Sequence, residues 1–146
     1  MARSAARLAA VQALYQHDME ATPLAMLIDE FHRHRLGGEV DPDIDGAQYA
    51  EAETAFFDDL VKGAIARREE IDERIGNHLA EGWKIGRLDR TMLQILRAGT
   101  YELMARPDVP TGSAISEYVD VAHAFFEARE AKFVNGVLDA VARAVR

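Results

Sequence analysis

Apolar residues near the C-terminal end recur at a spacing that buries one face of a helix. They are Phe133, Val134, Val137, Leu138, Val141 and Val145. Because positions three and four apart lie on the same side of a helix, these residues form one buried stripe. Lys132 and Asn135 fall off the stripe and are expected to face solvent. Gly136 is about 1 kcal/mol less favourable than alanine inside a helix, so we expect another helix or a ligand to approach its backbone closely.

The helical period continues along nearly the whole chain, and we find no alternating strand pattern of useful length. The expected helices span roughly 4–18, 24–36, 56–79, 88–103, 113–126 and 129 to the end. A break within the third would raise their number from six to seven. The glycines around Trp83 divide a single all-α domain, 1–146, into two packed helical halves, 1–81 and 82–146. Trp83 itself is expected to pack between these halves.

The composition narrows the class of protein. A chain of 146 residues, 49% of them hydrophobic, suits one domain with a real core. It has no cysteine, which excludes a disulfide framework and a thiolate zinc site. No apolar run approaches membrane-spanning length, and the N-terminus does not resemble a secretory signal. We therefore expect a soluble cytoplasmic protein.

The charge is acidic overall but unevenly distributed. A net charge of −8 and a pI near 5.1 argue against strong, salt-driven, non-specific binding to nucleic acid. The segment before Asp18 nevertheless holds two arginines, Arg3 and Arg7, and no acidic residue. A local basic patch is therefore compatible with the composition.

Four strings of sequence stand out when they are taken together. They are AAVQALYQ at 9–16, ILRAGTYEL at 95–103, DVP at 108–110 followed by AISE at 114–117, and KFVNGVL at 132–138. Their order and spacing resemble the NusB family of transcription antitermination factors over nearly the whole chain, and the last string is the most specific. The resemblance implies an all-α protein of two helical subdomains.

The resemblance also implies a function. Proteins of this family bind a short RNA element, boxA, together with NusE, which is also a small-subunit ribosomal protein. They act in an antitermination complex with RNA polymerase, notably during transcription of ribosomal RNA. They are not enzymes and use no cofactor. Members occur as monomers or as homodimers.

Carried over position by position, the resemblance implies an RNA surface on the first and last helices. Its positions are Arg3, Arg7, Gln12, Tyr15, Arg129, Lys132, Phe133 and Asn135. Arginines would contact phosphates without reading the sequence, and unpaired bases would stack on aromatic rings and hydrogen-bond to amides. The positions expected to face NusE are Asp89, Met92 and Leu93.

Two departures from the family pattern affect these expectations. Residues 4–6, Ser-Ala-Ala, interrupt the N-terminal basic run that is usual in the family, so we expect weak RNA binding by the chain alone. Met92 and Leu93 stand where the family commonly has a Glu-Arg pair. Leu93 is off the buried stripe and is therefore expected to be an exposed apolar contact for the partner.

Other functions stay open at this point. A helical scaffold that binds only protein is compatible with the acidic charge. A calcium-binding helical protein is suggested by residues 41–46, DPDIDG, which match the first half of a calcium loop. However, Ala52 stands where the closing glutamate belongs, so no metal site is predicted. An N-terminal part of a ribosomal-RNA cytosine methyltransferase would require a cofactor domain and a catalytic cysteine.

Overall fold

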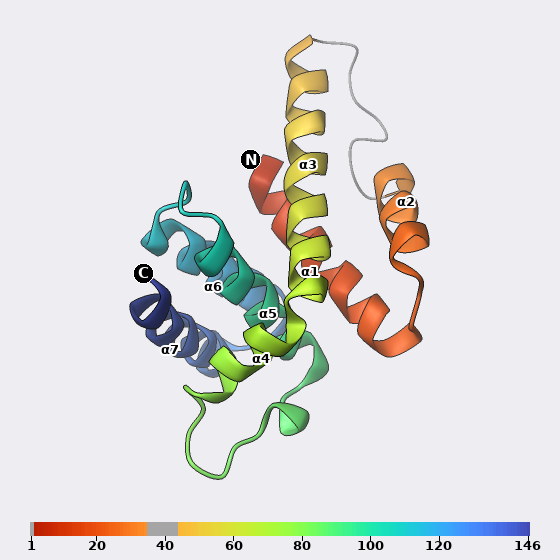
Figure 1. Ribbon diagram of the computed structural model, residues 1–146. Helices are drawn as coiled ribbons and strands as arrows, with labels where there is room; N and C mark the ends of the chain where they lie inside the picture. Colours follow the sequence, from red (N-terminus) through yellow and green to blue (C-terminus); the bar gives the residue numbers. More distant parts are fainter. Residues whose placement is uncertain (1, 35–43) are drawn as a thin grey trace.

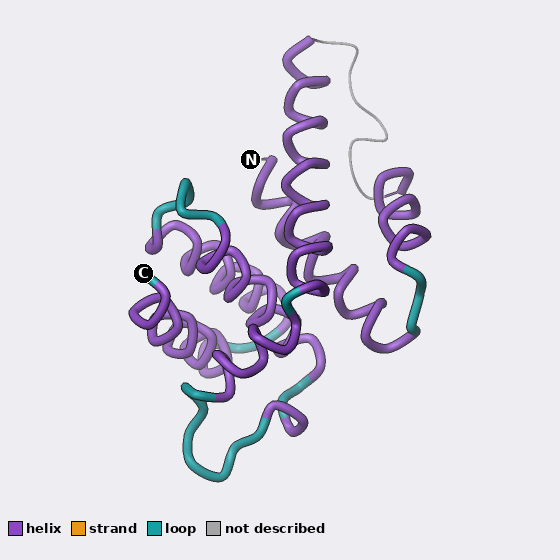
Figure 2. The backbone as a smooth tube through the Cα atoms, viewed as in Figure 1, coloured by secondary structure: helices purple, strands orange, loops and turns teal. Residues whose placement is uncertain are grey.

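The structure, a computed structural model, describes residues 2–34 and 44–146, and in these ranges it contains seven α-helices, one 3₁₀ turn and no strand. The helices are α1 Ala2–Glu20, α2 Leu24–His34, α3 Ile44–Ala66, α4 Arg68–Gly76, α5 Arg90–Ala105, α6 Thr111–Phe125 and α7 Ala128–Val145, and the turn η1 is Ile85–Arg87. Figures 1 and 2 show their arrangement. The predicted all-α class is confirmed, and the long third segment is broken at Arg67.

The N-terminal group consists of α1, α2 and α3. The inner face of α1 is built largely of small buried residues, Ala6, Ala9, Ala10 and Ala13. Because these side chains are short, α3 approaches α1 closely, and the two make the most extensive helix contact of the described chain. Phe31 of α2 stacks on Phe57 of α3, with ring centroids 5.5 Å apart. This contact holds α2 against the flank of α3.

α5 is the central helix of the C-terminal group. Every residue from Met92 to Leu103 is buried, which is the pattern of a helix surrounded on all sides. α6 and α7 pack against it, α4 covers a further side, and α1 joins it from the N-terminal group. Figure 1 shows α5 between α1 and the α6–α7 pair. The core is therefore continuous across the two groups.

The close approach of helices expected at Gly136 is made elsewhere. A Cβ atom built on Gly99 of α5 would lie 2.9 Å from Leu138 of α7 and 3.3 Å from Tyr118 of α6. A Cβ atom built on Gly136 would meet nothing within 4 Å, and this residue is exposed. The expectation of a second helix at Gly136 is wrong for the described chain, because α7 turns this residue outward.

Two expectations concern boundaries. α4 packs chiefly against α5, so it lies with the C-terminal helices, and the division of the halves at 81/82 stays a prediction. Residues 41–43 of the calcium-like string lie outside the described residues, while Ile44, Asp45 and Gly46 begin α3. None of the described helices is both long enough and apolar enough to cross a membrane.

Candidate nucleic-acid interface

The first turns of α7 present cations to solvent. The helix follows Glu127, whose backbone is extended, and its apolar stripe turns Val134 and Leu138 into the core. Lys132 and Asn135 are exposed on the opposite side. The Arg129 side chain is 91% exposed and has only a 3.4 Å contact with Glu130. Lys132 has no hydrogen bond or ion pair within the described ranges, so both cations are available to a phosphate.

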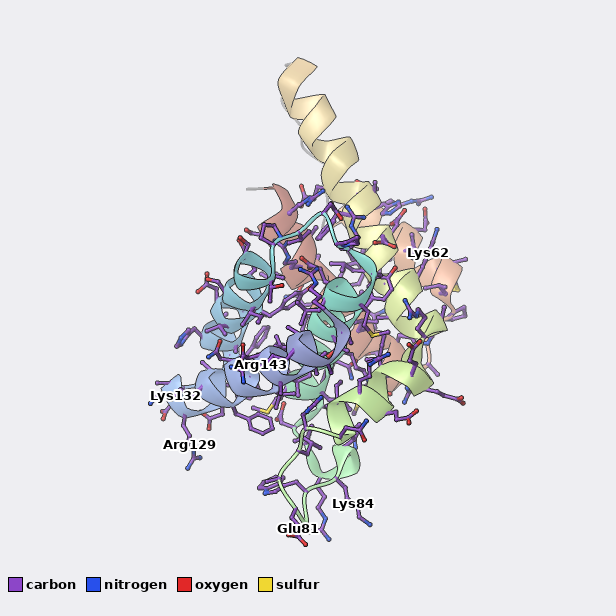
Figure 3. The ribbon with its side chains drawn as sticks, turned by 60° about the vertical axis from the view of Figure 1, so that its left-hand side comes forward. Lys62, Glu81, Lys84, Arg129, Lys132 and Arg143 are labelled. Atoms are coloured by element: carbon purple, nitrogen blue, oxygen red, sulfur yellow. The ribbon has the colours of Figure 1, made fainter. Side chains whose placement is uncertain are left out.

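Two segments carry exposed cations on this side of the molecule. In Figure 3, Arg129 and Lys132 lie together at one end of α7, and Lys84 projects from the loop at the bottom of the view, pointing away from them. Arg87 lines the same hollow as Arg129. Lys62, by contrast, projects from α3 on the other side of this view. Arg87 and Arg129 are far apart in the sequence, and the fold places both at the edge of one hollow.

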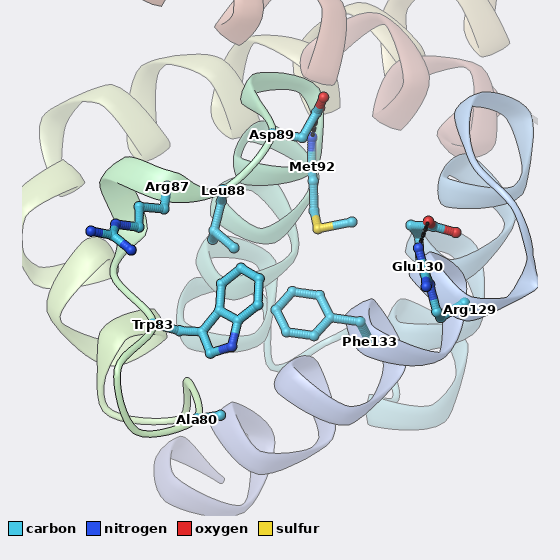
Figure 4. A pocket seen from close by; sticks show the side chains of 9 residues that line it. All are labelled: Ala80, Trp83, Arg87, Leu88, Asp89, Met92, Arg129, Glu130 and Phe133. Atoms are coloured by element: carbon cyan, nitrogen blue, oxygen red, sulfur yellow. Dashed lines mark hydrogen bonds and ion pairs between the residues drawn. The ribbon is translucent and has the colours of Figure 1, made fainter.

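An open hollow of about 570 Å³ separates the loop after α4 from the start of α7. Its lining includes Trp83, Arg87, Leu88, Met92, Glu130 and Phe133. Figure 4 shows the Phe133 ring pointing from α7 toward the indole of Trp83. Phe133 is partly buried and packs against the core, so its ring serves both the core and the hollow. Trp83, expected between the two halves, is instead 57% exposed.

A second hollow lies on the other side of the start of α5. It is lined by Val11, Gln12, Tyr15, Thr91 and Phe125. Tyr15 and Phe125 are 39% and 44% exposed, which is high for aromatic rings. Thr91 belongs to this hollow, whereas Asp89 and Met92 belong to the first. The start of α5 therefore lies between the two hollows.

This arrangement brings most of the predicted site residues together. Gln12 and Tyr15 of α1 lie on one side of the start of α5. Arg129 and Phe133 of α7 lie on the other side. The two surfaces that the sequence analysis assigned to RNA and to a protein partner are therefore adjacent.

The start of α5 is fixed by Asp89. Its Oδ1 accepts hydrogen bonds from the backbone N–H groups of Thr91 and Met92, at 2.8 and 3.1 Å, so this residue is the N-cap of the helix. Met92 is 7% exposed. Leu93 is 0% exposed, so its predicted role as an exposed apolar contact is wrong. Leu93 was expected to be exposed because it lies off the apolar stripe that contains Met92. It is buried because other helices surround α5 on every side.

Arg7 is the largest correction to the predicted RNA surface. It is only 4% exposed, and its Nε and Nη2 donate to the two carboxylate oxygens of Glu102 at 2.9 and 2.7 Å. The hydroxyl of Tyr118 donates to the same carboxylate at 2.8 Å. A buried arginine whose Nε and Nη2 are both bonded to one carboxylate does not reach a phosphate. Arg7 is thus part of the core that joins α1 to α5 and α6.

The ionisation of this cluster follows from its surroundings. Burial lowers the pKa of Arg7, but its hydrogen bond to Glu102 and the charge of that residue outweigh burial and raise the pKa. Burial, with the charge and hydrogen bond of Glu102, raises the pKa of Tyr118 well above its ordinary value. Arg7 is therefore charged and Tyr118 neutral at physiological pH.

Arg3 remains at the surface but lies apart from the two hollows. Its side chain is 46% exposed, pairs with Asp108 at 3.5 Å, and lies 4.7 Å from the centroid of the Phe56 ring. It precedes Tyr15 by twelve positions on α1, which is about 18 Å along the helix axis. Arg3 therefore does not share a site with the cations of α7, and its contact with RNA stays a prediction.

Several residues of these surfaces were missed by the sequence analysis. They are Lys84, Arg87, Phe125 and Glu130. A signal for the first two existed, because the loop around Gly82 (φ 87°) and Gly86 carries a lysine and an arginine three positions apart. Within the described residues no group of three acidic, histidine or cysteine side chains is placed to hold a metal ion.

Comparisons with known proteins agree with the fold and with the four strings of sequence. Residues 4–143 match the NusB family. A transcription antitermination protein NusB of Novosphingobium aromaticivorans is 70% identical, over 99% of this chain and 95% of the relative. The corresponding proteins of Sphingopyxis alaskensis and Caulobacter vibrioides are 65% and 49% identical, each over 99% of this chain and 94% of the relative.

Solved structures are similar over the same extent. T. maritima NusB superposes with a TM-score of 0.79 at 28% identity, covering 97% of this chain and 90% of that one. A crystal structure of the antitermination factors NusB and NusE in complex with double-stranded RNA gives a TM-score of 0.75 at 29% identity, covering 98% and 97%.

Proposed function

The chain belongs to the NusB family, and on that premise we propose that it binds boxA RNA together with NusE and supports transcription of ribosomal RNA operons. It acts by binding rather than by catalysis, in a cytoplasmic antitermination complex that contains RNA polymerase. A solved relative in complex with NusE and RNA supports both partners.

The observation that carries this proposal is the surface at the start of α7. The chain has a net charge of −8, yet Arg87 and Arg129 line an aromatic hollow, and Lys132 lies beside Arg129 at the same end of α7. Cations bind phosphates without reading sequence, and exposed rings stack on unpaired bases. The combination of the two is the expected footprint of a single-stranded RNA site.

The hollow around Tyr15 and Phe125 supports a protein partner. Exposed aromatic rings are common at the centre of protein interfaces, and this hollow shares the start of α5 with the RNA surface. We place NusE here, in contact with Tyr15 and Phe125 and reaching across the start of α5 to Asp89, which lines the first hollow, rather than with the buried Leu93. In this position NusE would extend the basic surface that the acidic chain supplies only in part.

The test is an RNA titration with and without NusE. A fluorescent RNA oligonucleotide that carries boxA, and a scrambled oligonucleotide of the same composition, are titrated by fluorescence anisotropy at two salt concentrations. We expect weak binding to the chain alone and clearly tighter, boxA-specific binding with NusE. The reason is that the isolated chain offers few cations to the phosphates of the RNA. Equal affinity with and without NusE would contradict the proposal.

A further inference from the structure

We infer that the outer face of α7, from Arg129 past Gly136 to Arg143, carries the backbone of an RNA strand that leaves the site at the start of the helix. The inference rests on the proposed function and deepens it, because it gives the course of the RNA beyond the first turns of α7. Two independent features support it: a glycine that the described fold does not need, and cations that the helix aligns on both sides of this glycine.

Gly136 has no role within the described fold. A Cβ atom built on it would meet nothing within 4 Å, and the residue is exposed in the interior of α7. Gly82 is the only glycine of the described residues with a positive φ, so the backbone of Gly136 is one that any residue adopts. Glycine is nevertheless among the least favourable residues inside a helix. Packing and backbone geometry therefore do not explain it, whereas the close approach of a ligand backbone does.

Three cations share the outer face of α7 with Gly136. Because each residue turns an α-helix by about 100°, Arg129, Lys132 and Arg143 all point within about 40° of the direction of Gly136. All three cations are exposed, and Figure 3 shows Arg129 and Lys132 at the first turns with Arg143 farther along the helix. The distance from position 129 to position 143 is about 21 Å along the helix axis, which is long enough for several nucleotides.

The one acidic residue beside these cations leaves Arg143 able to bind a phosphate. Oδ2 of Asp139 lies 3.0 Å from Nη2 of Arg143, in a pair whose side chains are 48% and 81% exposed. An exposed pair of this kind is weak, and a guanidinium has five N–H groups, so it can donate to a carboxylate and to a phosphate together. With three cations against one acid, the outer face stays positive in a chain of net charge −8.

An RNA backbone fits this face better than a second copy of the helix does. Cations bind the phosphates of RNA without reading its sequence. A second copy of α7 packed across Gly136 would instead bring like cations together, and like charges at an interface are costly. The outer face also begins at Arg129 and Lys132, the cations of the proposed RNA surface, so one strand can follow both.

The experiment separates the flank of the RNA from boxA itself. Labelled boxA RNA is compared with boxA extended by a run of uridines at its 5′ or its 3′ end. Each RNA is titrated in the presence of NusE by fluorescence anisotropy at several salt concentrations. We expect one of the two extensions to tighten binding and to steepen the slope of log affinity against log salt, because its phosphates reach Arg143. The extension that does so gives the direction of the strand.

Arg143→Ala removes the far cation of the outer face. It should weaken binding of the tighter extended RNA about fivefold at about 0.1 M salt and make the slope shallower by about 0.7, the loss of one phosphate contact on a single strand. Binding of boxA alone should not change. Arg33→Ala is the matched control, because Arg33 pairs with Asp29 at 3.2 Å with the same spacing and is 71% exposed, but lies on α2. It should bind every RNA like the parent.

Gly136→Leu tests the close approach of the strand. Leucine is a strong helix former, and its Cβ would stand in open space, so the variant should melt at or above the Tm of the parent. It should nevertheless bind the extended RNA several-fold less tightly, because the side chain holds the strand away from the cations. Ala25→Leu is the control, since it adds a leucine at an exposed position of α2 and should leave RNA binding unchanged.

The inference fails if neither extension changes the affinity or the slope, if Arg143→Ala and Arg33→Ala bind the extended RNAs alike, or if Gly136→Leu binds them like Ala25→Leu. The affinity for NusE without RNA and the mass of the chain in solution are measured for each variant. A loss of NusE binding or of a dimer in Gly136→Leu would assign the face to NusE or to a second copy, and would also overturn the inference. All of these results leave the binding of boxA alone intact, whereas failure of boxA to bind with NusE would refute the proposed function.

Discussion

Arg7 offers the sharpest test of how the structure reassigns the predicted RNA surface. Its guanidinium is buried and forms two charge-assisted hydrogen bonds with Glu102, at 2.9 and 2.7 Å. The family resemblance places it on the RNA surface, whereas its burial places it in the core. Substitution by alanine separates these two roles, because one predicts a loss of stability and the other a loss of RNA affinity.

The magnitude follows from the state of Glu102 in the variant. Arg7→Ala would leave a carboxylate that is 0% exposed with only the Tyr118 hydroxyl as a partner. Removing one member of a buried ion pair costs about 3–5 kcal/mol. For a domain of this size each kcal/mol lowers the Tm by about 2–4 °C, so we expect the Tm to fall by about 6–20 °C. Loss of the contact with the Phe56 ring, 5.1 Å away, acts in the same direction.

The assay pairs thermal unfolding, followed by circular dichroism, with boxA affinity in the presence of NusE at a temperature where the variant is folded. Arg3→Ala is the matched control, because Arg3 lies one helical turn earlier and contacts the same Phe56 ring, but is exposed and has a weak surface pair with Asp108 in place of a buried one. Its Tm should remain close to that of the parent. Replacing Arg7 and Glu102 together by methionine and leucine should recover part of the stability. An Arg7→Ala chain with unchanged Tm and much weaker RNA binding would refute this account of Arg7.

Three further outcomes are expected. Gly63→Ala should lower the free energy of unfolding by about 1–3 kcal/mol, because the new methyl group would collide with the Tyr101 ring. Gly136→Ala places its methyl group in open space and should raise the free energy of unfolding by about 0.5–1 kcal/mol. Denaturant melts of the two variants check both values. Burial and the hydrogen bond to Asp59 raise the pKa of Tyr101 to about 12. The contribution of the neutral Tyr101 hydroxyl to stability is therefore complete below pH 10 and is lost as the pH rises toward 12. When the Tm is measured from pH 9 to 12, it should fall less in Tyr101→Phe than in the parent. Tyr15→Phe should melt like the parent and lose only modest RNA affinity, since its exposed hydroxyl has no hydrogen bond to another described residue; a large fall in Tm would show that Tyr15 is structural.

The fold was predictable because its signals are local. Apolar spacing, proline and glycine boundaries, and caps depend on residues a few positions apart. The stripe of α7 is the clearest case, with Lys132 and Asn135 on the exposed side as expected. The break at Arg67 was left open by the pattern, because the apolar spacing of α3 runs on into α4 without a glycine or a proline between them.

The site was less predictable, because exposure depends on contacts between distant segments. Arg7 has its partner 95 positions away, yet Val11 and Leu14 lie on its side of α1, and this was a local sign of burial. Leu93 is buried because α5 is surrounded on all sides, which no spacing within the helix reveals. Trp83 is exposed because its loop lies at the edge of the hollow rather than between the halves.

The central claim, that RNA binds at the start of α7, is tested most directly by comparing Lys132→Ala with Lys62→Ala. Both lysines are exposed, and Figure 3 shows them on different sides of the molecule, so the two variants differ in the position of the lost charge and not in its size. The measurement is the slope of log affinity against log salt for boxA RNA in the presence of NusE. We predict that Lys132→Ala weakens binding and makes the slope shallower by about 0.7, the loss of one phosphate contact on a single strand, while Lys62→Ala leaves both unchanged. Identical affinities and slopes for the two variants would contradict the claim.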